Sequence, residues 1–361
     1  MTTIWNFAAG PARLPDAVLA RAGEELFARG ADGAAAIERP FSSAAFRETL
    51  AAARQNLADL LGLPPNYHVL FLAGGAMQQF SMLPLNLLGD ARCVAYADSG
   101  YWSKRAMAEA RRYADLHVVA AHAGESPLAA PSLAGWQLPD DCAYCHITPN
   151  ETVEGIAYPE LPDTGVVPLA ADCTSCFLMA PLDVSRFGVI YAGAQKNIGP
   201  AGMSVVIVHD DLLQRPAPLV PAPFSYRLQS EQGSCVNTPP TLAIALAGMV
   251  FEWIAGQGGL PAMADANRRK AERLYAAIDG SGGFYHAPVL PGHRSTSNVR
   301  FHLADDALTD VFIAEAEAHG LTHLRGHRHT GGLRASLYNA MPEAGVGALT
   351  AFMSDFARRR G

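Results

Sequence analysis

Short apolar runs that alternate with helical stretches constrain the fold of this chain more than any other feature. They begin at about residue 57, and the runs are residues 67–73, 92–97, 116–121, 142–147, 166–171, 189–192 and 203–208. Strands this apolar, without polar residues at alternate positions, are typical of a parallel sheet covered by helices on both faces. The pattern therefore predicts an α/β fold around a large, doubly wound, mostly parallel sheet.

The pattern changes after residue 255. Helices are expected over residues 239–256, 261–278, 307–319 and 346–360, and strands over 298–303 and 333–338. This mixture is typical of a smaller α+β layer that packs beside the large sheet. We expect a large domain of residues 16–255, and a small domain that combines residues 1–15 with residues 256–361.

Composition excludes several classes of protein. The 361 residues carry a formal net charge of −7 and no extended basic run, so a nucleic-acid partner has no electrostatic support. The N-terminus lacks a signal-peptide pattern, and the longest apolar window, residues 241–254, is too short to span a bilayer. We expect a soluble, cytoplasmic protein with no membrane partner.

Two C-x-x-C pairs, at residues 142–145 and 173–176, raise the possibility of a zinc site. Both pairs lie in or beside runs that are predicted strands, where residues three apart point to opposite faces. Their spacing also exceeds that of a usual zinc ribbon. No metal site is expected.

A lysine after an apolar strand is the first candidate for chemistry. Residues 191–202 read YAGAQKNIGPAG, which places Lys196 among small residues, where a lysine can lose its proton and form an imine with an aldehyde cofactor. Alone, such a lysine is more often a solvated strand end. Asp172 ends another apolar run 24 residues earlier and could pair with the ring nitrogen of pyridoxal phosphate. Together the two residues favour this cofactor.

The cofactor phosphate would need backbone N–H donors. Residues 74–77, Gly-Gly-Ala-Met, lie where a strand turns into a helix, and a helix N-terminus binds phosphate well. Trp102 follows another strand, and its ring could stack on the cofactor or simply pack in the core. The sequence leaves these two roles open.

Several long blocks of the chain resemble the phosphoserine aminotransferase family, a group of class V, fold-type I enzymes that use pyridoxal phosphate. The blocks are residues 6–11 (NFAAGP), 150–152 (NET), 183–202, 237–240 (NTPP) and 334–342 (RASLYNAMP). The block around Lys196 is long and specific, and the resemblance runs nearly from end to end. It implies a transamination in which glutamate donates its amino group and 3-phosphooxypyruvate accepts it.

The resemblance also implies roles for the cofactor site. Lys196 would hold the cofactor covalently, Asp172 would pair with the ring nitrogen, Trp102 would stack on the ring, and Thr152 would bond to its 3-hydroxyl side. The phosphate would be held by Ala76, Met77 and Gln195.

Further roles concern the substrate and the neighbouring subunit. Asn237 and Thr238 would reach the phosphate of a partner subunit, which implies a homodimer with shared active sites. Arg334 would clamp the substrate α-carboxylate in a bidentate pair. His327 and Arg328 would face the side-chain end of the substrate.

Departures from the family pattern concern the substrate pocket. Residues 39–43 read Arg-Pro-Phe-Ser-Ser, so Phe41 and Ser42 stand where the family usually has histidine and arginine. Met77 replaces a frequent arginine, and Met179-Ala180 replaces a usual Ser-Arg. Either Arg39 and Ser42 belong to a rearranged anion pocket, or the enzyme is a diverged transaminase that acts on a less anionic 2-oxo acid.

Overall fold

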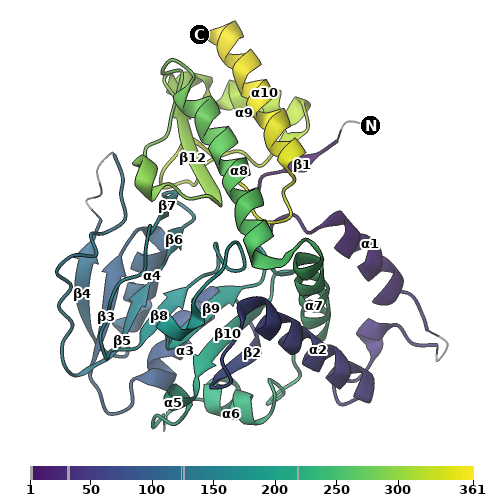
Figure 1. The fold of residues 1–361 in the computed structure, drawn as a ribbon, viewed down its shortest axis with the longest axis vertical. Coiled ribbons are helices and arrows are strands. Elements are labelled where there is room, and N and C mark those ends of the chain that lie inside the picture. The colour runs from purple at the N-terminus through teal and green to yellow at the C-terminus, as the bar shows by residue number, and fades with distance from the viewer. Residues whose placement is uncertain (1–2, 31–32, 123, 125–126, 218) are drawn as a thin grey trace.

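A seven-stranded sheet forms the centre of the computed structural model, which describes residues 3–30, 33–122, 124, 127–217 and 219–361 (Figure 1). The strands lie in the order β2–β10–β9–β8–β5–β3–β4. Their bounds are β2 (Tyr67–Ala73), β3 (Cys93–Asp98), β4 (Asp115–Ala121), β5 (Cys142–Ile147), β8 (Leu169–Asp172), β9 (Val189–Gly193) and β10 (Met203–His209). The mostly parallel sheet predicted from the sequence is confirmed.

One strand of this sheet runs against the others. β10 pairs antiparallel with both β9 and β2, whereas β3, β4, β5, β8 and β9 pair in parallel. Only residues 194–202 join β9 to β10, and a parallel crossover needs a dozen residues or more. The sequence pattern predicts residues 203–208 as a further parallel strand. This prediction is wrong, because the strand is antiparallel to both of its neighbours.

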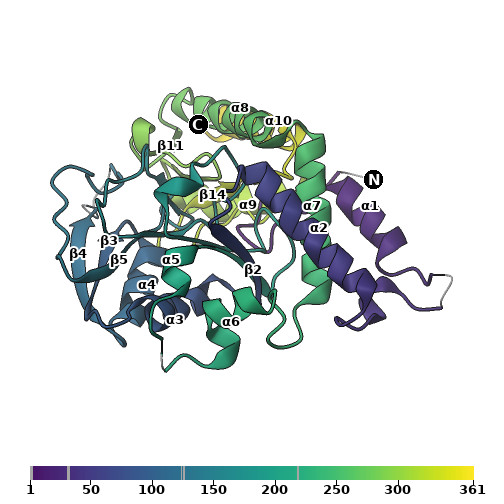
Figure 2. The same ribbon diagram turned by 60° about the horizontal axis from the view of Figure 1, so that its bottom comes forward.

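Helices cover both faces of the sheet because its strands are apolar on both sides. In β2, Val69 and Phe71 belong to one buried cluster, and Leu70 and Leu72 belong to another. Figure 2 shows the two sets of helices on opposite sides of the sheet. The first set is α1 (Asp16–Glu25), α2 (Ala44–Leu61) and α7 (Thr241–Gly256), and the second is α3 (Ala76–Leu87), α4 (Tyr101–Ala110), α5 (Asp210–Leu213) and α6 (Tyr226–Glu231).

The C-terminal part packs around a separate core. Its three-stranded antiparallel sheet comprises β11 (Tyr285–His286), β12 (Asn298–Leu303) and β14 (Leu333–Ser336), and its helices are α8 (Gly259–Asp279), α9 (Thr309–Ala318) and α10 (Glu343–Arg360). The N-terminal strand β1 (Trp5–Asn6) pairs in parallel with β13 (Leu321–Thr322), and Phe7 is buried in the same core. The N-terminal segment that contains β1 and Phe7 therefore packs with the C-terminal part of the chain.

Shorter elements complete the structure. β6 (Asn150–Glu151) and β7 (Ile156–Ala157) form a small hairpin, and 3-10 turns occur at residues 36–38, 184–186, 222–224, 291–293 and 306–308. Among the described residues, no single helix is long and apolar enough to cross a membrane, and one bent pair, α7 with α8, meets the length and composition test.

Several predicted boundaries were wrong, each for a local reason. The strand expected from residue 166 begins at Leu169, because Val166 is 99% exposed in a turn. The helix expected from residue 239 begins at Thr241, after both prolines. Cys173 and Cys176 lie beside β8, as expected, but in a turn, where the amide of Cys176 donates to the carbonyl of Cys173 over 3.0 Å.

Candidate active site

Residues at the carboxyl ends of the central strands surround one cavity of about 270 Å³. This volume is close to the lower end of the range for small-ligand clefts, which begins at about 300 Å³. The cavity is lined by Gly75, Ala76, Met77, Trp102, Thr148, Asn150, Thr152, Asp172, Thr174, Ser175, Gln195 and Lys196. These residues lie at or just after the carboxyl ends of β2, β3, β5, β8 and β9, as expected for a ligand site in an open α/β sheet.

Lys196 lies in the turn between β9 and β10 and is only 8% exposed. Its Nζ donates to Thr152 Oγ1 over 2.6 Å. Burial lowers the pKa of Lys196 to about 8, while Asp172 acts to raise it and Arg334 acts to lower it further. A substantial fraction of this amine is therefore neutral near pH 7–8, as a nucleophile requires.

The chain has three lysines, and the other two are poorly suited to covalent chemistry. Lys104 is exposed and pairs with Asp98 over 3.2 Å. Lys270 is buried, and burial lowers its pKa to about 7, but its Nζ donates to the carbonyls of Leu337, Tyr338 and Met341 over 2.9–3.0 Å. Three such bonds occupy every donor of the ammonium group.

Asp172 ends strand β8 with its carboxylate 5% exposed. Its Oδ1 accepts a 3.0 Å bond from the amide of Thr174. Burial raises the pKa of Asp172, and the bonds from Thr174 and the charge of Lys196 oppose that shift. A buried carboxylate with so little compensation is stabilised by a cation, and the protonated ring nitrogen of pyridoxal phosphate is such a cation.

Two glycines shape the turn between β2 and α3. Gly74 has a φ of +109°, and a Cβ there would lie 1.8 Å from Gln78 Oε1, so this position requires glycine. Its amide donates to the carbonyl of Gly202 over 2.9 Å, which ties the turn to the end of the Lys196 loop. The first turn of α3 then begins at Ala76 and presents its amides to the cavity, which suits a phosphate.

Trp102 forms one wall of the cavity from the first turn of α4. Its Nε1 and Thr148 Oγ1 are buried and have no hydrogen-bond partner among the residues that the structure describes. The aromatic wall matches the ring of pyridoxal phosphate, and the two polar atoms without partners match its polar edge. The buried carboxylate matches the ring nitrogen, and the helix N-terminus matches the phosphate. The residues present therefore fit this cofactor.

Arg334 lies beside the cavity on strand β14. Its Nη1 donates to the carbonyl of Thr152 over 3.4 Å, and its buried Nε has no partner in the described part of the chain. Burial lowers the pKa of Arg334, although a guanidinium stays charged at any physiological pH. Its free donors suit a substrate carboxylate close to Lys196.

The other predicted substrate residues lie outside the cavity lining. The ring of His327 lies 4.9 Å from that of Tyr101, which in turn contacts Trp102 edge-on at 5.2 Å. Arg328 and Ser42 are exposed, and Arg39 lines a different cavity of about 290 Å³ together with residues of α2 and α7.

The residues expected to reach a partner subunit, and the pair Met179-Ala180, are not part of the lining of this cavity either. Asn237 and Thr238 are exposed in the segment between α6 and α7. Met179 is buried, with its carbonyl accepting a 3.0 Å bond from Asn267 on α8, while Ala180 is exposed and lines another cavity.

Sequence reasoning missed several residues of the site. Thr148, Asn150, Thr174 and Ser175 all line the cavity. Thr174 follows Asp172 by two residues, a spacing at which an aspartate commonly accepts from the backbone, so local turn chemistry could have found it. Asn150 belongs to the block of residues 150–152 that resembles the family, but its hydrogen bonds to Ser175 and Asn298 depend on tertiary contacts.

Comparisons with known proteins agree with this geometry. The family model described as "Aminotransferase class-V" matches residues 4–349. The phosphoserine aminotransferase of Acidithiobacillus ferrooxidans is 48% identical over 359 residues and covers 99% of each chain. That of Chromobacterium violaceum is 46% identical over 362 residues and covers 100% of each.

Solved structures agree as well. Phosphoserine aminotransferase from Bacillus circulans subsp. alkalophilus has a TM-score of 0.96 and 42% identity, with 99% of each chain covered. The enzyme of Trichomonas vaginalis, solved with pyridoxal phosphate bound, has a TM-score of 0.92 and 38% identity, with 97% of this chain and 99% of that one covered. The chain therefore belongs to the class V aminotransferases and, within them, to the phosphoserine aminotransferase family of pyridoxal-phosphate-dependent transaminases.

Proposed function

We propose that this enzyme transfers the amino group of L-glutamate to 3-phosphooxypyruvate, yielding O-phospho-L-serine and 2-oxoglutarate, a step of serine biosynthesis. The observation that carries the proposal is the buried amine of Lys196, held 2.6 Å from Thr152 in a cavity that also contains the Asp172 carboxylate. The phosphorylated substrate is supported by the names of relatives that match almost the whole chain.

The residues of the site divide the work of transamination. Bound pyridoxal phosphate supplies an electron sink for the pair of electrons released at the substrate Cα. Lys196 Nζ accepts the proton from that carbon as a general base and later returns a proton as a general acid. Asp172 would hold the ring nitrogen in its protonated form, Trp102 would pack against the ring, and Arg334 would orient the substrate α-carboxylate.

A less anionic 2-oxo acid is a competitor for the role of amino acceptor, and the lining of the cavity favours it. Lys196 is the single basic side chain among the described residues lining the cavity, and Met77 at its edge is 49% exposed. This lining favours a less anionic 2-oxo acid unless Arg328, Arg39 or Ser42, or the same residues of a partner, complete an anion pocket. Purified enzyme assayed with glutamate should show a higher kcat/KM for 3-phosphooxypyruvate than for 3-hydroxypyruvate. The reverse order would establish the competitor.

We infer that two chains share their active sites in a homodimer. Exposure of Asn237 and Thr238, away from their own cavity, supports this, because both are then free to contact a second chain. Complementation tests it. Lys196→Ala and Asn237→Asp homodimers should each be poorly active, and refolding them together should restore activity in mixed dimers that contain one intact composite site. No recovery in dimers shown to be mixed would refute sharing.

Replacing Arg334 with lysine should raise KM for both the amino donor and the amino acceptor by about 10–100-fold. Lysine keeps the charge but loses the planar fork that binds a carboxylate through two parallel bonds. Both substrates carry an α-carboxylate, so both KM values should rise. Arg325→Lys, an exposed neighbour in the same hairpin, is the control and should leave both values unchanged. A rise for one substrate alone would contradict the assignment.

The rate at which apo-protein binds pyridoxal phosphate covalently should depend on pH in the manner set by Lys196. The neutral amine reacts, so the rate should rise about tenfold per pH unit below pH 8 and level off above it. Borohydride trapping at each pH measures this rate. N-α-acetyl-lysine, whose amine has an ordinary pKa, should continue to accelerate to about pH 10. The same continued rise in the protein would exclude a lowered pKa.

A further inference from the structure

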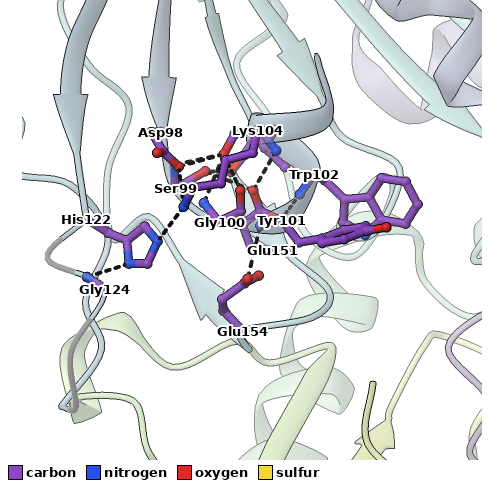
Figure 3. A network of polar contacts seen from close by, with 12 residues as sticks. Asp98, Ser99, Gly100, Tyr101, Trp102, Lys104, His122, Gly124, Glu151 and Glu154 are labelled. Atoms are coloured by element: carbon purple, nitrogen blue, oxygen red, sulfur yellow. Dashed lines mark hydrogen bonds and ion pairs between the residues drawn. The ribbon is translucent and has the colours of Figure 1, made fainter. Parts of the chain in front are cut away.

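Two carboxyl groups meet the first turn of α4, the helix that carries Trp102 (Figure 3). Glu151 Oε2 accepts from the amide of Trp102 over 3.0 Å, and Glu151 Oε1 accepts from the amide of Ser103 over 2.9 Å. Glu154 Oε1 accepts from the amide of Tyr101 over 3.0 Å. Three successive amides that a helix start leaves without partners are thus bonded by side chains from a distant segment.

These carboxyl groups are unusually well buried for a helix cap. Glu151 is 0% exposed and also accepts a 3.2 Å bond from Ser99 Oγ. Burial, and then the charge of Glu154, raises the pKa of Glu151 to about 8. Burial also raises the pKa of Glu154, and the amide of Tyr101 and the charges of Lys104 and Arg300 oppose that rise. A surface cap would hold the helix at much lower desolvation cost, so simple capping does not explain this arrangement.

The backbone at Gly100 lies so close to Glu151 and Glu154 that a side chain at this position would collide with them. A Cβ there would lie 2.5 Å from Glu154 Oε2 and 3.0 Å from Glu151 Cδ. The first turn of α4 therefore packs directly against the two carboxyl groups. The amides of residues 101–103 bond directly to these two side chains, so the position of this turn depends on them.

Thr152, the residue after Glu151, contacts both the lysine and the arginine of the site. Thr152 Oγ1 accepts from Lys196 Nζ over 2.6 Å, and the Thr152 carbonyl accepts from Arg334 Nη1 over 3.4 Å. The dipeptide 151–152 therefore contacts three elements that come from separate parts of the sequence: the helix that carries the Trp102 wall, the lysine loop, and the arginine strand.

We propose that Glu151 is a positioning residue, whose carboxyl group sets the place of Trp102 relative to Lys196 and Arg334 by joining the start of α4 to Thr152. The inference rests on the pyridoxal-phosphate-dependent activity of the family and is independent of which oxo acid is used. Glu151 itself does not line the cofactor cavity, so it acts through the residues that it holds.

Glu151→Gln and Glu151→Ala test this role. Glutamine keeps one accepting oxygen but turns an NH₂ group toward the second amide, whereas alanine removes both acceptors. The matched control is Ser225→Ala, which removes the cap of α6, where Ser225 Oγ accepts from the amide of Leu228 over 3.3 Å. Helix α6 lies in the same part of the fold, and Ser225 does not line the cofactor cavity.

Three measurements are needed at a temperature where every variant is folded by circular dichroism. Hydrogen exchange of the apo-protein should show faster exchange at residues 101–103 in both Glu151 variants. The dissociation constant of pyridoxal phosphate should rise, and kcat should fall by between about tenfold and 10²-fold, in the order wild type, glutamine, alanine. Ser225→Ala should change exchange only in α6 and leave the other two measurements alone.

The outcomes separate positioning from simple structural support. Faster exchange at residues 101–103 together with weaker cofactor binding supports the proposal, and if the alanine variant fails to fold, the glutamine variant decides. Faster exchange with unchanged cofactor affinity and kcat would show that Glu151 only caps the helix, and would overturn it. Because exchange and cofactor binding need no oxo acid, failure here is distinct from a wrong choice of amino acceptor.

Discussion

Replacing Lys196 with alanine is expected to lower transaminase activity by about 10⁴-fold and to abolish covalent retention of the cofactor. The amine serves both as the attachment point and as the base that moves the proton at the substrate Cα, so one substitution removes both functions. The affinity for the cofactor should fall less steeply, because the phosphate cradle at the start of α3, Trp102 and Asp172 remain.

Lys104→Ala is the matched control for this experiment. Lys104 is exposed on α4 and pairs with Asp98, so its loss should leave the activity within about twofold of the wild type, as for most surface substitutions. An active Lys196→Ala enzyme would show that the attachment point had been assigned to the wrong lysine.

Replacing Asp172 with asparagine should give the second-largest loss, a fall in kcat of roughly 10²-fold to 10³-fold. Removing one partner of a buried charge pair costs about 3–5 kcal/mol, and each 1.4 kcal/mol corresponds to a factor of ten. Asparagine keeps the size of the side chain and can still accept from the amide of Thr174. The loss therefore reports the missing charge against the ring nitrogen.

The control for Asp172 is Thr174→Val, which removes a hydroxyl that accepts from the amide of Gly193 over 3.1 Å and also bonds to Asp172, but leaves the carboxylate in place. We expect a smaller loss from this variant than from Asp172→Asn, because the negative charge is kept. If Asp172→Asn retained kcat while Thr174→Val lost it, the carboxylate would have a structural role instead.

Local sequence was enough to predict the parts of the site that depend on neighbours along the chain. The small residues around Lys196, the strand that ends at Asp172 and the Gly74-Gly75 turn all carry their signal within about ten residues. Each is a strand end, and strand ends of a parallel sheet meet at one edge, so their convergence could be expected. The choice of pyridoxal phosphate followed from the lysine and the aspartate together.

Contacts between distant segments could not be predicted in this way. Glu151 bonds to residues near 102, about fifty positions earlier, and Arg334 bonds to Thr152 across 182 positions. No periodicity in the sequence marks either pair. The direction of β10 was also missed, because an apolar run of residues has the same pattern in a parallel and in an antiparallel pairing.

The roles of His327, Arg328, Arg39 and Ser42 toward the substrate remain predictions, and so do the domain boundaries at residues 15 and 255. None of these four side chains lines the cofactor cavity, and the ring of His327 contacts that of Tyr101 beside Trp102.

Mapping the covalent attachment site tests the central claim most directly. Holoenzyme is reduced with borohydride, digested and analysed by mass spectrometry, and the chain offers only Lys104, Lys196 and Lys270 as acceptors. A pyridoxyl group is expected on the peptide that contains Lys196, at close to one per chain. Modification of Lys270, or equal labelling of Lys104 and Lys196, would contradict the assignment of Lys196.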